Sequence, residues 1–276
     1  MTHHTLLAVV VVLVGLTPAA APAQAPTPPP TSTSTDDSPL RFARWVVGDV
    51  LAPFRQARDH HALAALGVGG GIALFTLGDA ELTEEAAEQY GGPAAPVFDL
   101  TSELGGRPGL IGAAALFGGS LFTDDTRFQD AAFTSLEAGL YASFVTNMLK
   151  GAFGRVRPLD GGDPFDFEPF SGHYSFPSGH TTLAFGLVVP WVVYYPGPVT
   201  YGLGAVAVGT AAARVALQKH WPTDVLAGAF IGSATGYLLA RRHLRLSPSA
   251  GGASPTVTAA PLLVPSGAGL RLALTF

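Results

Sequence analysis

The sequence contains no cysteine, and this absence excludes a group of chemistries at once. Among its 276 residues there is no thiol to act as a nucleophile, to bind a metal or to form a disulfide. Charged residues make up only 13% of the chain and the formal net charge is -5, so there is no basic surface for nucleic acid. Histidine, serine and carboxylate groups remain as candidates for reactive groups.

Uninterrupted hydrophobic runs long enough to cross a bilayer are also scarce. Such a helix needs ~20 mostly apolar residues, and several apolar stretches here are shorter, rich in Gly and Ala, and in one case interrupted by Glu137. The cationic group Arg241, Arg242, His243 and Arg245 does not fix an orientation across a membrane. We therefore predict a packed bundle associated with a membrane, with a protein of six membrane spans as the alternative.

Hydrophobic residues make up 48% of the chain, enough to bury one large core. The apolar stretches of helical length are Ala62–Leu77, Leu110–Phe122, Ala131–Leu149, Thr181–Tyr195, Val199–Val215 and Val225–Leu239. The predicted fold class is all-α, a helical bundle with about six core helices.

Both ends of the chain have compositions unlike the middle. Leu6–Leu16 followed by the small residues Ala19–Ala25 is typical of a secretory signal, so we predict a signal peptide over 1–25, with an uncleaved anchor as the alternative. Residues 26–40 form a linker rich in Pro, Thr and Ser, and the main domain spans 41–245. Residues 246–276 are predicted as a linker and a small C-terminal β-hairpin, Thr256–Val264 and Gly269–Phe276. The protein is expected in the periplasm or cell envelope.

Three segments carry candidate chemistry, and the first follows the third apolar stretch. Lys150 lies near the end of a predicted helix that breaks at Gly154, and Arg157 precedes Pro158 in an extended conformation. Two cations can thereby converge on one anion. Taken alone, cations at the end of an apolar helix more often complement its dipole.

The second segment is Phe176-Pro-Ser-Gly-His-Thr-Thr182, at the start of another apolar stretch. Ser178 is placed to cap the following helix, and Gly179 allows a ligand to approach the exposed backbone N–H groups, an arrangement that binds phosphate. An ordinary capped helix with His180 in its first turn explains the string equally well. The same triplet occurs at Ser171-Gly-His173, where no helix-long apolar run follows, so His173 is interpreted as a loop residue.

The third segment runs from Arg214 to Asp224, with Arg214 ending one helix and Pro222 opening the next. If the second helix starts promptly, Asp224 lies near the imidazole of His220. A carboxylate that accepts the Nδ1–H of a histidine fixes its tautomer and leaves Nε2 as a directed nucleophile. A helix-capping His/Asp pair is the alternative for this segment alone.

Taken in order, Lys-x6-Arg-Pro, Pro-Ser-Gly-His and Arg-x5-His-x3-Asp resemble the type 2 phosphatidic acid phosphatase superfamily, which also includes bacterial acid phosphatases and vanadium haloperoxidases. The motifs span Lys150–Asp224 and are jointly highly specific. One departure is Ala213, where the family usually has Ser, which places a supporting hydrogen bond to the arginine in doubt.

The resemblance implies a role for each site residue. His220 attacks phosphorus and becomes phosphorylated, His180 protonates the leaving group and later activates water, and Asp224 holds His220. The phosphate is bound by five residues: Lys150, Arg157, Ser178, Gly179 and Arg214. No metal and no cofactor are implied, so catalysis should survive chelators.

The expected function is therefore a metal-independent phosphatase that hydrolyses a phosphomonoester or pyrophosphate. A lipid such as phosphatidate or an isoprenyl pyrophosphate is the favoured substrate, with a soluble phosphomonoester as the alternative. A vanadium haloperoxidase and a non-catalytic envelope protein that binds lipid phosphates are the alternatives. The loop Asp160–Phe170 alternates acidic and aromatic residues and is interpreted as a solvated lip. Its aromatics, with Tyr174 and Phe176, could receive an acyl chain or headgroup.

Overall fold

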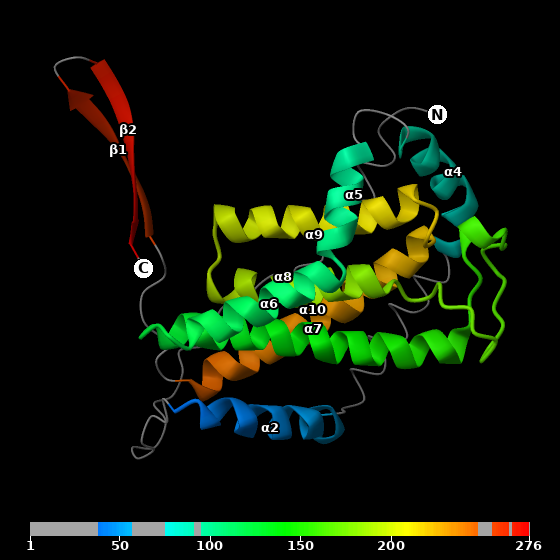
Figure 1. Ribbon diagram of the computed structural model, residues 1–276, viewed down its shortest axis with the longest axis horizontal. Helices are drawn as coiled ribbons and strands as arrows, with labels where there is room; N and C mark the ends of the chain where they lie inside the picture. The colour runs from blue at the N-terminus through cyan, green and yellow to red at the C-terminus, as the bar shows by residue number, and fades with distance from the viewer. Residues whose placement is uncertain (1–37, 57–74, 91–94, 248–255, 265–266, 276) are drawn as a thin grey trace.

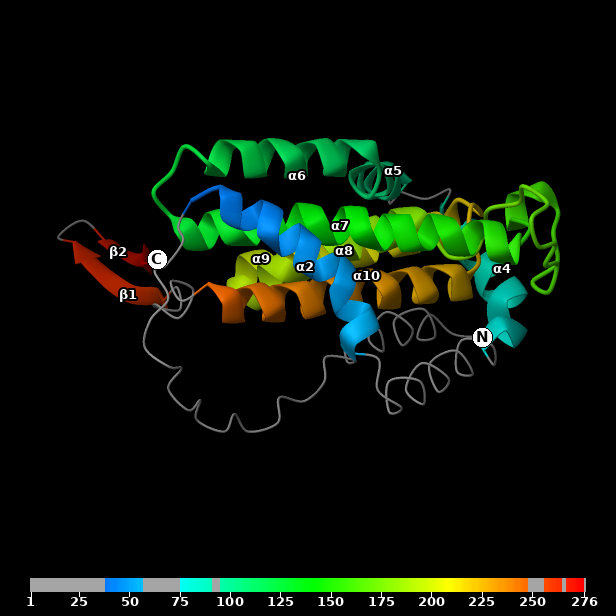
Figure 2. The ribbon, with the colours of Figure 1, turned by 90° about the horizontal axis from the view of Figure 1, so that it is seen from below.

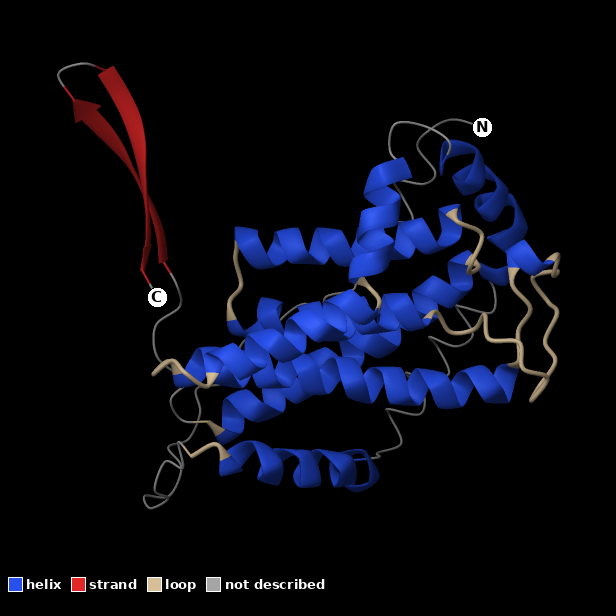
Figure 3. Cartoon of the chain, viewed as in Figure 1, coloured by secondary structure: helices blue, strands red, loops and turns tan. Residues whose placement is uncertain are grey.

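Helices account for most of the chain that the computed structural model describes, namely residues 38–56, 75–90, 95–247, 256–264 and 267–275 (Figure 1). In chain order the α-helices are α2 (Leu40–Gln56), α4 (Asp79–Tyr90), α5 (Ala95–Leu104), α6 (Arg107–Ser120), α7 (Thr126–Phe153), α8 (Gly179–Tyr194), α9 (Pro198–Ala216) and α10 (Pro222–Leu246). Short 3-10 helices occur at Thr76–Gly78 and Pro158–Asp160. Strands β1 (Thr256–Val264) and β2 (Gly267–Thr275) pair antiparallel with each other, outside the helical bundle (Figure 3).

The predicted apolar stretches from Leu110 onward correspond to α6, α7, α8, α9 and α10. The stretch Ala62–Leu77 lies mostly outside the described residues, as do the predicted signal peptide 1–25 and most of the linker 26–40. Helices α2, α4 and α5 were not predicted, because they are shorter or more polar than the apolar stretches used to find helices.

The long helix α7 begins and ends where its flanking residues permit. Asp125 accepts a hydrogen bond from the backbone N–H of Phe128 at 2.9 Å, which caps the first turn. Gly154 ends the helix in the left-handed conformation with φ 56°, and a Cβ there would lie 1.7 Å from the carbonyl oxygen of Glu168. Only glycine fits this position, so the chain leaves α7 directly after Phe153.

Helix α8 lies at the centre of the bundle and packs against α7, α9 and α10. Small residues allow the close approach: a Cβ on Gly232 of α10 would lie 2.4 Å from the carbonyl oxygen of Thr182, and one on Gly186 of α8 would lie 3.1 Å from the Cα of Gly139 in α7. The abundance of Gly in these stretches therefore reflects helix-to-helix contact at backbone distance.

Helix α2 lies across α7 and α10 (Figure 2). Its Phe42 and Trp45 pack with Phe133 of α7 and Phe117 of α6. Its buried Arg41 pairs with Asp130 of α7 at 3.0 Å between Nε and Oδ1. These contacts attach the first described helix to the main bundle.

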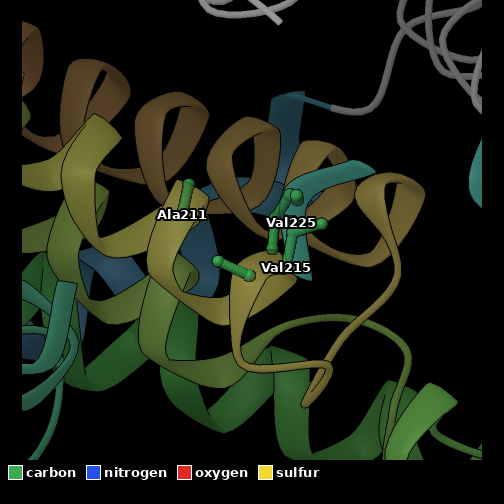
Figure 4. Packing of buried hydrophobic residues seen from close by; sticks show 5 residues of the cluster. Ala211, Val215 and Val225 are labelled. Carbon is green, nitrogen blue, oxygen red and sulfur yellow. The ribbon is translucent and has the colours of Figure 1, made fainter. Parts of the chain in front are cut away.

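A second set of contacts joins α4 to the ends of α9 and α10. Figure 4 shows Ala211 and Val215 of α9 beside Val225 of α10, and Ala86 of α4 belongs to the same buried cluster. The cluster fixes the position of α4 at the end of the bundle where α9 stops and α10 starts.

Among the residues that the structure describes, helices α9 and α10 are long and apolar enough to cross a membrane by length and composition. About half of the relevant window in each is buried within the bundle, at 44% and 50%. Core helices of soluble proteins pass the same test, so the finding concerns length and hydropathy only.

Candidate active site

The three motif segments meet at one end of the bundle, on the right in Figure 1. Helices α7 and α9 end there, and α8 and α10 begin there, because the four helices run alternately up and down. Lys150 lies in the last turn of α7, His180 in the first turn of α8 and Arg214 in the last turn of α9. His220 lies in the short connection before α10.

A cavity of about 460 Å³ lies between these helix ends. Six of the eight predicted site residues line it. The complete lining consists of Asn147, Lys150, Arg157, Tyr174, Gly179, His180, Arg214 and His220. The two predicted residues that do not line it, Ser178 and Asp224, are fully buried.

Three cationic side chains contribute to the cavity wall, from α7, the following loop and α9. Burial is the main reason that the pKa of Lys150 is lowered to about 8; Asp224 opposes the shift, and Arg157 and Arg214 contribute to it. Among the described residues, the buried Nε atoms of Arg157 and Arg214 have no hydrogen-bond partner. The wall therefore carries concentrated positive charge with donors suited to an anion.

Arg214 receives support from a helix outside the three motifs. Its Nη1 donates to the Oγ of Ser102 in α5 at 3.1 Å. Ala213 is fully buried and has no hydroxyl to offer. Ser102 thus provides a hydroxyl contact for the arginine that Ala213 cannot provide, and a lone serine in a helix gave no sequence signal of this role.

His220 lies against Asp224, as the prompt start of α10 at Pro222 requires. The distance from His220 Nδ1 to Asp224 Oδ2 is 3.5 Å, longer than a fully formed hydrogen bond. The pKa of His220 is lowered to about 4, mainly by burial, with Asp224 opposing the shift and Lys150 and Arg214 contributing to it. The free imidazole is therefore neutral near pH 7, with Nε2 on the ring edge away from Asp224.

Asp224 itself is held by several donors. Its Oδ1 accepts from Arg155 Nη1 at 2.6 Å, and its Oδ2 accepts from Ser175 Oγ and from the backbone N–H of Trp221 at 2.9 Å. Arg155 lies within the first motif segment, where the sequence alone indicates no role for it. In the structure it is fully buried and contacts Asp224 rather than the cavity.

The structure corrects the prediction for Ser178 in two respects. Ser178 is at the N-cap position of α8, but its hydroxyl is 3.0 Å from Thr181 Oγ1 and makes no capping hydrogen bond to the backbone. Its N–H donates to the carbonyl of Asp224 at 2.9 Å and so is not free to bind phosphate. Gly179 does line the cavity, at the N-terminus of α8 where backbone N–H groups lack intrahelical acceptors.

His180 shares the cavity with the three cations. Its pKa is lowered to about 4, mainly by burial and in smaller part by the nearby cations Arg214, Lys219, Lys150 and Arg157. A Cβ on Gly106, at the junction of α5 and α6, would lie 3.0 Å from His180 Nε2. This junction therefore covers the imidazole closely, a contact between residues too far apart in sequence to be predicted.

The loop between α7 and α8 borders the cavity at Tyr174. Phe165 and Phe170 are exposed, as expected for a lip. His173 is a half-exposed loop residue, with Nε2 at 3.4 Å from Glu168 Oε2. It lies outside the cavity, in agreement with its interpretation as a loop histidine.

One group of potential metal ligands exists among the described residues, and it lies elsewhere. The ligand atoms of Asp49, Glu137 and His243 are within 4.8 Å of one another. Asp49 is also paired with Arg242 and with His243 Nε2, at 2.5 and 2.7 Å. Glu137 is thirteen residues before Lys150 on α7, roughly 20 Å along the helix, so this ion-pair network is remote from the cavity.

The three motif segments lie in the part of the chain that resembles known proteins. Residues 131–247 match the PAP2 superfamily. The segment from α7 to the end of α10 therefore belongs to the PAP2 superfamily. The PAP2 match runs from α7 to the end of α10 and includes all eight predicted site residues, whereas α2, α4, α5 and α6 precede it.

Two curated relatives of this PAP2 protein are named as lipid A 1-phosphatases. The protein from Rhizobium johnstonii is 37% identical over 101 residues, which are 34% of this chain and 40% of that protein. The protein from Rhizobium etli is 36% identical over 100 residues, 34% of this chain and 42% of that protein. The aligned part thus spans about two fifths of each relative.

A solved structure shares the fold. The crystal structure of the PAP2 type phosphatidylglycerolphosphate phosphatase from Bacillus subtilis has a TM-score of 0.50 and 21% sequence identity, and covers 75% of this chain and 98% of its own. This likeness supports the all-α helical fold of PAP2 type. It gives no support to the C-terminal hairpin as part of that fold.

Proposed function

We propose that this PAP2 protein is a phosphatase that acts on a phosphorylated lipid through a phosphohistidine intermediate. The observation that carries the proposal is a single cavity lined by Lys150, Arg157 and Arg214 together with the two histidines His180 and His220. Three cations suit a phosphate group, and two neutral imidazoles suit nucleophilic attack and proton transfer.

The proposed reaction has two balanced steps. Nε2 of His220 attacks phosphorus, the bond from phosphorus to the leaving oxygen breaks, and His180 donates its proton to that oxygen. Water then attacks the phosphohistidine, His180 takes a proton from it, and phosphate leaves as His220 is regenerated. Asp224 accepts the Nδ1–H of His220 throughout and keeps Nε2 as the reacting atom.

The cations have both a binding and a catalytic role in this proposal. Lys150, Arg157 and Arg214 neutralise the equatorial oxygens as charge develops on the transferring group. A bound phosphate dianion also raises the pKa of His180 from about 4, because it offsets the cations that lower it. Binding of substrate thereby places a proton on the residue that must donate it. The proposal assigns no step to a metal or cofactor.

Several features favour a lipid substrate. The relatives named above act on lipid A and on phosphatidylglycerolphosphate by their names. Large apolar side chains are exposed along the bundle, with Phe144 and Met148 of α7 at 62% and 63% and Leu238 of α10 at 62%. With the two candidate spans α9 and α10, these favour a membrane-associated protein, exported through the signal peptide predicted over 1–25.

The first experiment measures phosphate release from lipid A, phosphatidylglycerolphosphate and a soluble phosphomonoester with excess EDTA present. We expect chelator-resistant release, fastest with one of the lipids, and a loss of roughly 10⁴-fold or more in His220→Ala. His173→Ala is the matched control, since His173 is a loop histidine outside the cavity, and it should behave as wild type. Equal release by wild type and His220→Ala would refute the nucleophile.

Two further assays separate the alternatives. Halide oxidation that depends on added vanadate, without hydrolysis, would indicate a haloperoxidase. Binding of lipid phosphate that His220→Ala leaves intact, without turnover of any substrate, would indicate a binding protein. His220 is neutral and lies beside a carboxylate that can orient it, and this favours a catalytic role for His220 over a role in binding alone.

A further inference from the structure

A carboxylate outside the three motifs lies behind the proposed nucleophile. Asp79, the first residue of α4, is fully buried and precedes the matched segment 131–247. Its Oδ2 accepts from Arg155 Nη2 at 2.7 Å and from Thr223 Oγ1 at 2.5 Å. Its Oδ1 accepts from the backbone N–H of Thr223 at 2.9 Å. Burial raises the pKa of Asp79, and the donors from Thr223 and Arg155 oppose that rise.

Arg155 lies between Asp79 and Asp224. Its Nη1 donates to Asp224 Oδ1 at 2.6 Å and its Nη2 to Asp79 Oδ2 at 2.7 Å, and all three residues are fully buried. One guanidinium is thus shared by two carboxylates. With two carboxylates and one guanidinium, the group of Asp79, Arg155 and Asp224 has a net negative charge.

This balance affects His220 because Asp224 is its only carboxylate contact among the described ion pairs. An Asp224 paired with Arg155 alone would form a neutral pair, with weak attraction for charge on the imidazole. Asp79 offsets the guanidinium, so negative charge remains beside His220 Nδ1. At low local dielectric such a charge acts strongly on its neighbour.

The phosphorylated imidazole needs this charge. When His220 Nε2 forms its bond to phosphorus while Nδ1 keeps its proton, the ring becomes positively charged. The surroundings otherwise oppose this: Lys150 from α7 and Arg214 from α9 lower the pKa of His220, and Arg157 and His180 share the cavity. Negative charge must come from the opposite side of the ring, where Asp224 lies.

We propose that Asp79 is a positioning residue that acts through Arg155 to keep negative charge on the Asp224 side of His220, and thereby favours phosphohistidine formation. This rests on the proposed function. Docking of α4 through the cluster around Ala86 and Val215 places Asp79 at Arg155. Helix α4 therefore supports catalysis through Asp79, in addition to packing against the end of the bundle.

The test uses the full chain and the variant Asp79→Asn, which keeps the shape of the side chain and removes its charge. We expect at least a tenfold fall in kcat and in the rate of phosphoenzyme formation, with KM within about twofold. The acidic limb of the profile of kcat/KM against pH moves to lower pH, because Arg155 without Asp79 lowers the pKa of His220. Glu81→Gln, an exposed residue in the same turn of α4, is the control for charge alone.

The double variant Asp79→Asn/Arg155→Gln distinguishes charge from structural support. It removes one positive and one negative charge, so Asp224 again faces His220 with net negative charge. The proposal predicts that the double variant is at least fivefold more active than Asp79→Asn. A double variant no more active than the single one overturns it. Should Asp79→Asn fail to fold, the double variant alone decides, with activity below about one hundredth of wild type overturning the proposal.

The proposed function and the role of Asp79 can fail independently. Wild-type turnover abolished in His220→Ala supports the phosphohistidine reaction whatever Asp79→Asn does. If those two results hold and Asp79→Asn matches Glu81→Gln in kcat and pH profile, only the role of Asp79 is refuted. If wild type shows no turnover, the proposed function fails first and the role of Asp79 fails with it.

Discussion

At Lys150, the positive charge proposed to bind phosphate is opposed by its own surroundings. Burial and the neighbours Arg157 and Arg214 lower its pKa to about 8. A lysine with a lowered pKa is charged below that value and neutral above it, so the anion site loses one of its three cations as the pH rises. A permanently charged arginine does not show this change.

We therefore predict that KM for a phosphorylated substrate rises above about pH 8 in the wild type. The dependence of kcat/KM on pH reports the free enzyme, in which no bound phosphate stabilises the charged lysine, whereas kcat reports the complex with bound phosphate. A loss of charge in the free enzyme alone therefore appears as a rise in KM. In Lys150→Arg the rise should disappear, even if the baseline KM differs. The measurement is KM between pH 6 and 10. It is made in a non-ionic detergent, so that the charge of the detergent does not change with pH. A wild-type KM that stays flat to pH 10 would contradict the role of Lys150.

At the scale of the elements, the close contact between α8 and α10 fixes the site. A Cβ on Gly232 would lie 2.4 Å from the carbonyl oxygen of Thr182 and 2.9 Å from the backbone nitrogen of Gly186. Backbone atoms cannot move aside as a flexible side chain can. A larger residue at this position forces the two helices apart.

Gly232→Ala should lower the free energy of unfolding by about 1–3 kcal/mol and reduce activity, because α8 carries His180 and α10 follows His220. Gly202→Ala in α9 is the matched control, since a Cβ there meets nothing within 4 Å. It should stabilise by up to ~1 kcal/mol through helix propensity. Thermal or denaturant unfolding in the same detergent compares the two, and equal stability of both variants would count against the packing argument.

The elements also show what the sequence could predict. Long apolar stretches and Gly154 predicted α7 and its end, and Pro222 predicted the start of α10. Helices α4 and α5 could not be found in this way, because α4 is polar and α5 is short. Ser102 and Asp79 lie on these helices, so their contacts with Arg214 and Arg155 depend on tertiary packing that no local pattern records.

For the whole molecule, the helical part from α2 to α10 contains all the residues of the candidate site. The motif spacing identified the residues that gather at the cavity, but not how each would act. Spacing placed Ser178 beside the phosphate, whereas its N–H is used by Asp224. The choice between a cavity-lining role and a buried supporting role depends on the packing of α8 against α10.

Removal of residues 248–276 should leave phosphate release within about twofold of the full chain. The expectation follows because the cavity is lined entirely by residues between Asn147 and His220. The assay is kcat/KM of the shortened chain in the same detergent, and the helical content by circular dichroism serves as the folding control. A loss of tenfold or more with helical content intact would assign the C-terminal segment a part in catalysis.

The hydrogen bond from the N–H of Ser178 to the carbonyl of Asp224 has a consequence for how the cavity can deform. It joins the first turns of α8 and α10, so His180 and the support of His220 keep a fixed spacing. The carbonyl of Tyr174 is likewise tied to α7, through a hydrogen bond from Lys150 Nζ. Gly106, which covers His180 at the α5–α6 junction, makes only local backbone hydrogen bonds among the described residues, with Glu103 and Leu110. Substrates of different bulk should therefore be accommodated at this junction, and changes in selectivity should map to it, while the distance between the two histidines stays constant.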